Sequence, residues 1–439
     1  MRLPGLKGFD EEAFNKYFKN TGWLMFGKIL SMVVGFVIAR YLGAVSFGDL
    51  SFADAFTTIV AAVGALGLDS FIIREIINEP HKKDEILGTS LLMRLSVNFL
   101  LIPLTIGIYL LFHHYSARPG DSLSWIILIL SFASFFKSFN VIDSYFQSQV
   151  ASKYVVKVQN ICVVLSAVIK VVLVVFHLPL IYFAAALTFD SLSLSAGLIY
   201  MYHQRGMSLF TWTFSRSRAI ALLKQSFPLI LSAVMVSIYM KIDQVMLKDV
   251  GSAEVGIYSA AARISEAWYF IPVAVVTSVF PAIIHARKTD LERYTKRLKN
   301  LYDLLVFISL PVAVVISFLG TAIIHLLYGD AYQGAGQMLS IHIWSGIFVF
   351  LGSASSQYLL AEGYTMTAFQ RTFLGAVVNI LLNLWLIPKY GGVGASIATL
   401  IACFVSAFYL LLIPKTREQG FMMLKSLFLF TAFQKIFKR

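Results

Sequence analysis

The feature that most constrains this chain is a series of apolar stretches, each long enough to cross a bilayer as a helix. Such a helix needs about 20 apolar residues to cross the hydrocarbon core, and about twelve stretches meet this length. The connections between them are too short to form a soluble domain. The predicted spans are 21–41, 47–73, 88–112, 123–147, 155–176, 179–202, 225–247, 256–284, 301–327, 336–361, 368–388 and 392–413. The sequence therefore predicts an all-α integral membrane protein.

Composition and the placement of charge agree with a membrane protein. Of the 439 residues, 58% are hydrophobic and 13% are charged, whereas soluble domains average about 25% charged residues. The net charge of +13 is compatible with nucleic-acid binding, but the basic residues lie in the connections between apolar stretches. That distribution sets orientation in a membrane, so we expect no nucleic-acid partner.

Lys and Arg gather in alternate connections along the chain. The basic segments include the N-terminal segment, the loop 203–224, the stretch 287–299 and the C-terminal tail. By the positive-inside rule, this alternation places both termini in the cytoplasm of a bacterial inner membrane. The N-terminal segment has no apolar core typical of a signal peptide, so the first span is expected to direct insertion.

The chain resembles itself at an offset of 208 residues, the distance from Arg40 to Lys248. Arg40-Tyr-Leu-Gly43 and Gly48 align with Lys248-Asp-Val-Gly251 and Gly256. The match follows the first and seventh spans, which indicates parallel six-helix repeats. The expected division is an N-terminal lobe 1–202, a cytoplasmic linker 203–224, a C-terminal lobe 225–414 and a cytoplasmic tail 415–439, in which 421–439 forms an interfacial helix.

Motifs of soluble enzymes are absent from the sequence. It contains no Walker A loop, no Gly-x-Ser-x-Gly and no His-Glu-x-x-His. The two cysteines, Cys162 and Cys403, have no metal-ligand spacing. We therefore expect no cofactor, no metal centre and no catalysis, and transport driven by ATP hydrolysis on this chain is excluded.

Charged side chains inside the predicted spans are the candidate functional residues. A central Lys or Arg costs about 2.5 to 3.5 kcal/mol on insertion scales unless it meets water, an acid or the headgroups. Three cations near cytoplasmic span ends, Arg94, Lys157 and Arg371, are expected to snorkel. The remaining cations either brace helices or line a hydrated passage for an anionic cargo; they are Lys28, Lys137, Lys170, Lys241 and Arg263.

The acids deep in spans are fewer, and they serve either in salt bridges or in coupling to protons or sodium. They are Asp54, Asp190, Asp243 and Glu266. Arg263 and Glu266 are three residues apart, so they share a helix face and can pair. Lys241 and Asp243 are two apart and are expected to have separate partners. The histidines in spans, His325 and His342, are interpreted as interior groups rather than proton relays.

A cationic passage suits a pyrophosphate, because Arg and Lys give it charge-assisted hydrogen bonds without chemistry at phosphorus. Outward movement of negative charge from a negative interior is also downhill, by about 2.3 kcal/mol per charge per 100 mV.

Three stretches, spread over nearly the whole chain, resemble the polysaccharide flippases (Wzx type) of the multidrug/oligosaccharidyl-lipid/polysaccharide exporter superfamily. They are Asn20-Thr-Gly-Trp23 with Ala39 to Gly43 and Phe47-Gly48; Lys241 to Leu247 with Val255 to Ala261, Arg263, Glu266 to Trp268 and Pro272; and Asn379, Asn383, Leu386 to Gly391 and Gly394 to Thr399. The resemblance implies two pseudo-symmetric six-helix lobes around a central cavity that opens alternately to each membrane face.

The cargo that the resemblance implies is an undecaprenyl-pyrophosphate-linked oligosaccharide repeat unit, as in O-antigen and lipopolysaccharide biosynthesis. The implied partners are membrane lipids, a coupling proton or sodium ion, and a polysaccharide polymerase with its chain-length regulator. Lipid II flippases share an Arg-x-x-Glu that resembles Arg263-Ile-Ser-Glu266. The chain departs from them in lacking two further C-terminal spans, which disfavours a peptidoglycan precursor.

Two alternatives remain open. A cationic-drug exporter of the same superfamily needs a passage with more acids than bases. A membrane polysaccharide polymerase needs a sizeable basic periplasmic loop, and the longest predicted one is only 113–122.

Overall fold

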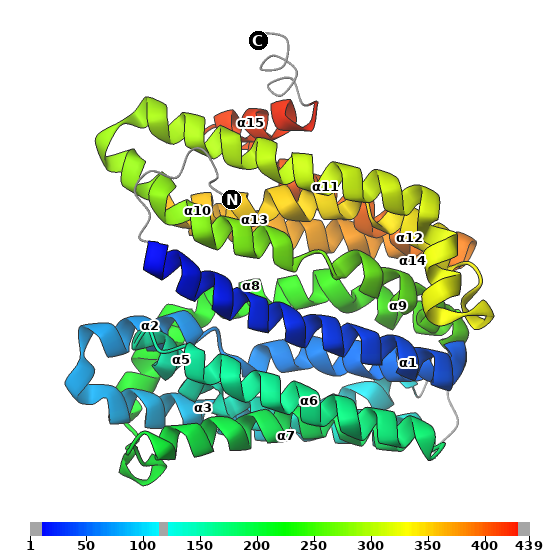
Figure 1. Ribbon diagram of the computed structural model, residues 1–439, viewed down its shortest axis with the longest axis horizontal. Coiled ribbons are helices and arrows are strands. Elements are labelled where there is room, and N and C mark those ends of the chain that lie inside the picture. Colours follow the sequence, from blue (N-terminus) through cyan, green and yellow to red (C-terminus); the bar gives the residue numbers. More distant parts are fainter. Residues whose placement is uncertain (1–10, 114–121, 429–439) are drawn as a thin grey trace. The chain divides into compact units, whose positions relative to one another are not determined.

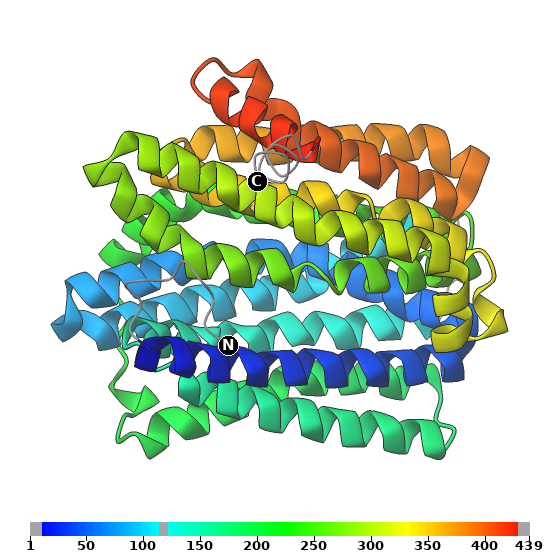
Figure 2. The same cartoon turned by 45° about the horizontal axis from the view of Figure 1, so that its top comes forward.

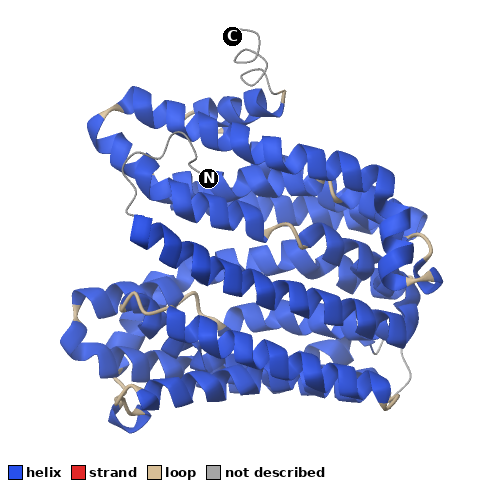
Figure 3. Cartoon of the chain, in the orientation of Figure 1, coloured by secondary structure: helices blue, strands red, loops and turns tan. Residues whose placement is uncertain are grey.

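The computed structural model describes residues 11–113 and 122–428, and these residues form helices and short connections (Figure 3). Most of the α-helices are labelled in Figure 1. Their bounds are α1 Glu11–Gly64, α2 Asp69–Asn78, α3 Lys83–His113, α4 Ser122–Lys137, α5 Val141–Ser148, α6 Lys153–Val175, α7 Leu180–Gln204, α8 Arg216–Met246, α9 Ser252–Glu266, α10 Phe270–Thr289, α11 Leu291–Tyr328, α12 Ala335–His342, α13 Ser345–Ala361, α14 Thr365–Phe408 and α15 Arg417–Leu427. The described part of the chain contains no strand, so the all-α prediction is confirmed.

Ten helical stretches of the described chain are long and apolar enough to cross a membrane. Two of them contain a glycine at which the backbone leaves the helical region. Gly43 breaks α1 with φ 69° and ψ 172°, and Gly391 breaks α14 with φ 54° and ψ −134°. Each of these long helices holds two predicted spans, one on either side of its glycine. The ten stretches therefore accommodate the twelve predicted spans.

Outward-facing apolar side chains on the long helices indicate the medium around the protein. Phe318 on α11 is 85% exposed, and α6 exposes a row of aliphatic side chains from Ile161 to Val175. Contiguous apolar surface of this kind is a liability in water. It is the normal outer surface of a helix in lipid.

The helices form two compact units. The first contains residues up to Tyr41 together with Val60–Ile230, and the second contains Leu42–Ile59 together with the chain from Leu231. The predicted lobes stay a prediction; they differ from these units because 42–59 groups with the C-terminal helices.

In the first unit, α4 and α6 pack against α7, and α2 packs against α5. Its core includes Ile72, Ile76, Leu87 and Tyr202. In the second unit, α13 packs against α14 and α11 against α12. Small buried residues, such as Ala260, Ala261, Ala395 and Ala398, allow its helices to approach closely, as is usual in membranes.

The predicted linker and tail are more helical than the sequence indicated. The stretch between α7 and α8 is only 205–215, with one 3₁₀ turn at Leu209–Thr211. In the tail, α15 (red in Figure 2) packs on α11. Ser426 donates a 2.7 Å hydrogen bond to Asp303. The rest of the predicted interfacial helix, 429–439, lies outside the described residues.

Candidate functional site

A buried carboxylate near the end of α8 is the centre of the most elaborate polar cluster in the second unit. Asp243 is 2% exposed. Tyr258 of α9 donates to its Oδ2 at 2.5 Å, and Asn383 of α14 donates to its Oδ1 at 2.5 Å. Thr399 of α14 also donates to Oδ2. Asn383 in turn donates to Asn379 at 3.2 Å. We call these five residues the Asp243 cluster.

The break in α14 is what brings Asn383 and Thr399 to the same carboxylate. Asn383 precedes the break at Gly391 and Thr399 follows it. At Gly391 a Cβ would lie 2.4 Å from Oε1 of Glu254, and the same oxygen accepts a 2.7 Å hydrogen bond from the amide of Gly392. The positive φ favours glycine at this position.

Neutral donors compensate the charge of Asp243. No Lys, Arg or His nitrogen lies within 4.0 Å of its carboxylate in the described chain. The cluster also holds buried polar atoms without a partner, namely Nδ2 of Asn379 and Oδ1 of Asn383. One carboxylate with amide and hydroxyl oxygens matches a proton or a singly charged cation, whereas divalent ions take more carboxylates. Among the described residues, no group of three or more His, Cys, Asp or Glu side chains could hold a metal ion.

Two candidate residues from the sequence lie beside this cluster and pair with each other. Nζ of Lys241 on α8 lies 3.8 Å from Oε2 of Glu266 at the end of α9, and each side chain is about a quarter exposed. Lys241 and Asp243 thus have separate partners, as their spacing predicts. The spacing of Arg263 and Glu266 allows them to pair, but among the described residues the ion pair of Glu266 is with Lys241.

Arg263 turns instead toward an aromatic group. Its guanidinium lies 4.6 Å from the ring centroid of the buried Phe47, and that ring contacts Tyr328 and Tyr332. The side chain of Arg263 is exposed, and no carboxylate in the described chain lies within 4.0 Å of it. Arg263 is therefore an exposed cation whose guanidinium makes a cation–π contact with Phe47.

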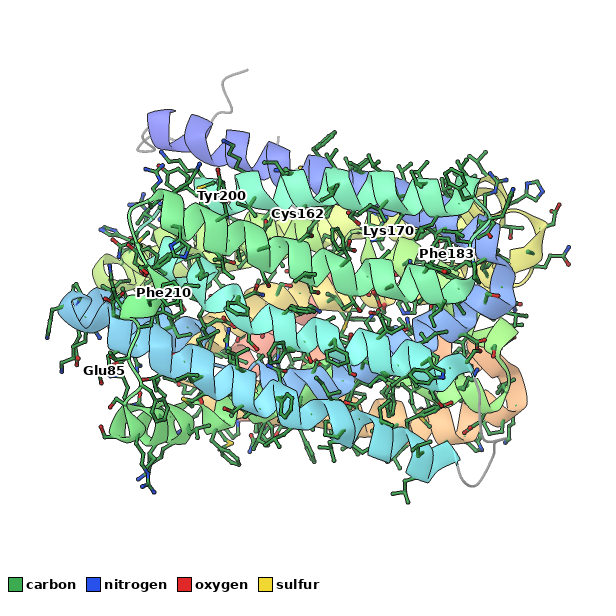
Figure 4. All side chains as sticks on the ribbon, turned by 90° about the horizontal axis from the view of Figure 1, so that it is seen from below. Glu85, Cys162, Lys170, Phe183, Tyr200 and Phe210 are labelled. Carbon is green, nitrogen blue, oxygen red and sulfur yellow. The ribbon has the colours of Figure 1, made fainter. Side chains whose placement is uncertain are left out.

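The other candidate cations differ in their surroundings. Nζ of Lys170 on α6 lies 2.5 Å from Oδ2 of Asp190 on α7, so these two candidates form one ion pair. Figure 4 labels Lys170 in the first unit. Lys28 and Lys137 are exposed, and within the described residues Lys137 has no ion pair. Asp54 is half-buried and likewise lacks an ion pair in the described chain.

The snorkelling prediction is wrong for two of its three residues. Arg94 is 3% exposed and pairs with Asp69 at 2.9 Å. Arg371 is 7% exposed and donates to Ser355, Ser356 and the carbonyl oxygen of Gly352. Both guanidiniums found partners inside the protein, which removes the need to reach the headgroups. Lys157 is exposed.

The repeat found in the sequence reappears as a reciprocal helix contact within the second unit. A Cβ on Gly48 of α1 would lie 1.7 Å from the carbonyl oxygen of Ser252, and a Cβ on Gly256 of α9 would lie 2.0 Å from that of Ala44. Ser252 is the repeat counterpart of Ala44, as Gly256 is of Gly48. The two helices thus cross with matching contacts, and we call this contact the glycine crossing.

An ion pair lies beside the glycine crossing. Nζ of Lys248 lies 2.6 Å from Oδ1 of Asp49 and also donates to Oγ of Ser252 at 2.6 Å. The counterpart glycines Gly43 and Gly251 both have positive φ, at 69° and 147°. Sequence reasoning quoted these glycines for the repeat but assigned Lys248 and Asp49 no role.

Known proteins resemble this chain in sequence and in fold. The model of the family described as "Polysaccharide biosynthesis protein" matches residues 17–287, and a MatE model matches 228–385. A probable flippase, AglR of Haloferax volcanii, is 31% identical over 158 residues, which are 35% of this chain and 33% of that protein. An uncharacterized membrane protein of Methanocaldococcus jannaschii is 28% identical over 123 residues, 28% of this chain and 24% of that protein. The chain thus spans a third or less of the length of these relatives.

Among solved structures, the lipid II flippase MurJ in an inward closed conformation matches with a TM-score of 0.76 at 19% identity. The match covers 95% of this chain and 93% of that chain. The chain was expected to lack two C-terminal spans of the lipid II flippases, but only a small part of the MurJ chain is left uncovered by the match. Because the family model matches more than half of the sequence, the chain belongs to the polysaccharide biosynthesis protein family and has the fold of the multidrug/oligosaccharidyl-lipid/polysaccharide exporter superfamily.

Proposed function

We propose that this protein is a flippase that moves an undecaprenyl-pyrophosphate-linked oligosaccharide from the cytoplasmic to the periplasmic leaflet by alternating access. The observation that carries the proposal is the presence of exposed cations on membrane helices without a neutralising acid. Arg263 and Lys137 have no carboxylate within 4.0 Å in the described chain. Asp54 is the one candidate acid to which the described residues supply neither a cation nor a hydrogen-bond donor.

The chemistry of these groups fits a pyrophosphate. Arg263 can give an anion paired, charge-assisted N–H donors, and its guanidinium lies 4.6 Å from the ring centroid of Phe47. No bond at phosphorus has to break, so binding and release are sufficient. The same superfamily contains multidrug exporters, and an acid-rich passage would be needed for cationic drugs; ethidium efflux tests that alternative.

The Asp243 cluster is proposed as the coupling site for a proton or sodium ion. Asp243 and Lys241 lie two residues apart on α8, and Tyr258 and Glu266 lie on α9. A cation at Asp243 would add positive charge near the Lys241–Glu266 pair and so change the affinity of the passage for an anion. Occupancy of the cluster and binding of cargo would then be linked reciprocally.

Opening toward the periplasm is proposed to separate the glycine crossing and the Lys248–Asp49 pair. The positive-inside rule places the connections at 42–47 and 248–252 on the periplasmic side, with both termini in the cytoplasm of the inner membrane. A reporter that is active only in the periplasm should be active when it is fused after residue 45 or after residue 250. Fusions that are inactive because these positions lie in the cytoplasm would reverse the proposed direction.

The test is a deletion strain analysed for lipid-linked glycan. Without the protein, undecaprenyl-linked repeat units should accumulate on the cytoplasmic leaflet. Accumulation of unpolymerised units in the periplasm would indicate a polymerase. Plasmid-borne Arg263→Ala and Lys137→Ala should fail to restore export, and Arg263→Lys should restore it in part. Lys224→Ala, which removes an exposed cation at the start of α8, is the matched control and should restore it fully.

A further inference from the structure

A basic cluster with an aromatic centre lies at the shared end of α6 and α7, in the first unit. Nζ of Lys153 lies 5.0 Å from the ring centroid of Tyr154, and Cζ of Arg205 lies 3.7 Å from the same centroid. Lys153 begins α6 and Arg205 follows the last residue of α7. Lys157 lies one helical turn further along α6 and is therefore on the same face. We call Lys153, Tyr154, Lys157 and Arg205 the basic platform.

No acid neutralises the platform. Lys153, Lys157 and Arg205 are all exposed, and none has an ion pair within 4.0 Å among the residues that the structure describes. Like charges that share one ring repel each other, and an aromatic face compensates each of them only weakly. This arrangement favours an anion at the platform.

Exposed apolar and aromatic side chains lie close to the platform residues in the sequence. Val150 is 91% exposed and has φ 53°, a conformation that is a genuine outlier for a β-branched residue. Phe210, on the 3₁₀ turn after α7, is 95% exposed, and Tyr200 is 62% exposed. Figure 4 shows Tyr200 and Phe210 toward the same end of this unit, away from Phe183.

The adjoining surface of α6 is exposed and apolar. Its exposed residues beyond Lys157 are Ile161, Val164, Leu165, Val168, Val171, Val172 and Val175. A ligand on the platform therefore has acyl-chain surface directly beside it. Exposed aromatic rings with lysine and arginine are typical of the level where headgroups meet hydrocarbon.

We propose that the basic platform binds the phosphate headgroup of an anionic phospholipid, with the acyl chains along α6. The proposal does not depend on the cargo, because it uses none of the residues assigned to transport. Each cation near a membrane surface strengthens attraction to anionic lipid by about fivefold. Loss of two of them should weaken retention of an anionic lipid by more than tenfold and leave a zwitterionic lipid unaffected.

The experiment is native mass spectrometry of the purified full chain with equal amounts of phosphatidylglycerol and phosphatidylcholine. The wild type should retain phosphatidylglycerol preferentially, and Lys153→Gln/Arg205→Gln should lose the preference. The matched control, Arg216→Gln/Lys224→Gln, removes two exposed cations at the start of α8 and should keep it. Tyr154→Phe should keep it as well, because the ring face remains.

Three outcomes would overturn the proposal. The platform variant could retain the lipid as the wild type does. The control could lose the lipid equally, which would mean attraction by net charge alone. Replacing chloride by phosphate at the same ionic strength could displace the lipid, which would make the platform a site for free phosphate. Thermal melting in detergent, equal for all variants, shows that a loss of lipid is not a loss of fold.

Discussion

The glycine crossing allows the sharpest quantitative prediction, the effect of Gly48→Ala. In the structure, the new methyl would lie 1.7 Å from the carbonyl oxygen of Ser252, 2.8 Å from its carbonyl carbon and 2.9 Å from the amide nitrogen of Gly256. All three neighbours are backbone atoms, so no rotamer change relieves the contact. A tolerable contact needs about 3 Å or more, and the helices would have to separate by more than 1 Å.

The expected cost follows from two opposing effects. Alanine is the better helix former by about 1 kcal/mol, while overpacking of this kind costs about 1 to 3 kcal/mol and the separation also strains the Lys248–Asp49 pair. We expect a net destabilisation of about 1 to 2 kcal/mol, measured by thermal unfolding of the purified protein in detergent. Gly107 on α3 has no atom within 4 Å of a Cβ, so Gly107→Ala is the control and should stabilise the protein.

The reciprocal geometry supplies a second check. Gly256→Ala places its methyl 2.0 Å from the carbonyl oxygen of Ala44, so it should cost about as much as Gly48→Ala. Once one methyl has separated the helices, the second methyl should cost little. The double variant should therefore lose clearly less stability than the sum of the losses of the two single variants. The contact would be refuted if Gly48→Ala were as stable as Gly107→Ala. It would also be refuted if the costs of Gly48→Ala and Gly256→Ala added fully in the double variant.

Three further predictions concern charge. The proposed ion site predicts that sodium at 100 times its Kd stabilises the wild type by about 2.7 kcal/mol and that Asp243→Asn loses this stabilisation. Melting curves across sodium concentration check this, and an unchanged sodium response in the variant would exclude the cluster as the coupling site. Lys170→Met should cost about 1 to 3 kcal/mol, because it leaves the partly buried Asp190 without its cation, and Lys170→Met/Asp190→Leu should cost much less, because both charges are gone. Loss of glycan export in the double variant despite normal stability would assign Lys170 to cargo. Hydrogen bonds from Lys82 and Arg218 lower the pKa of Glu79 from 4.5 to about 2. The ionised Glu79 therefore stabilises the fold fully above pH 4.5, and this contribution is lost as the pH falls toward 2. Glu79→Gln should flatten the dependence of stability on pH in that window, and an unchanged dependence would contradict the assignment.

The membrane spans could be predicted because apolar length is a local property. Each span appears as a run of residues, and the two places where helices continue across predicted loops, at Gly43 and Gly391, were already marked by glycine. The glycines of the repeat were visible for the same reason. What their alignment could not show is that Gly48 and Gly256 touch, because contact depends on how the two segments pack.

The partners of buried charges could not be predicted, because they come from distant parts of the chain. Asn383 is 140 residues from Asp243 and Thr399 is 156 residues away. Both stood in the motifs that carry the family resemblance, but only the break in α14 places them on one carboxylate. Spacing within one helix allowed a pair of Arg263 with Glu266, but in the described chain Glu266 pairs with Lys241 of α8.

The ion pairs of the candidate lysines bear on which cations could bind the cargo. Lys170 and Lys241 are each matched by a carboxylate, so replacing either one disturbs helix packing and charge together. Arg263 and Lys137 lack such partners in the described chain, while Asp54 is an acid without a cation. These two cations and one acid carry less positive charge than the sequence indicated, but their sum is still positive. The proposed preference for an anion therefore depends on Arg263 and Lys137, and a double alanine variant that keeps full glycan export would remove the physical basis for an anionic cargo.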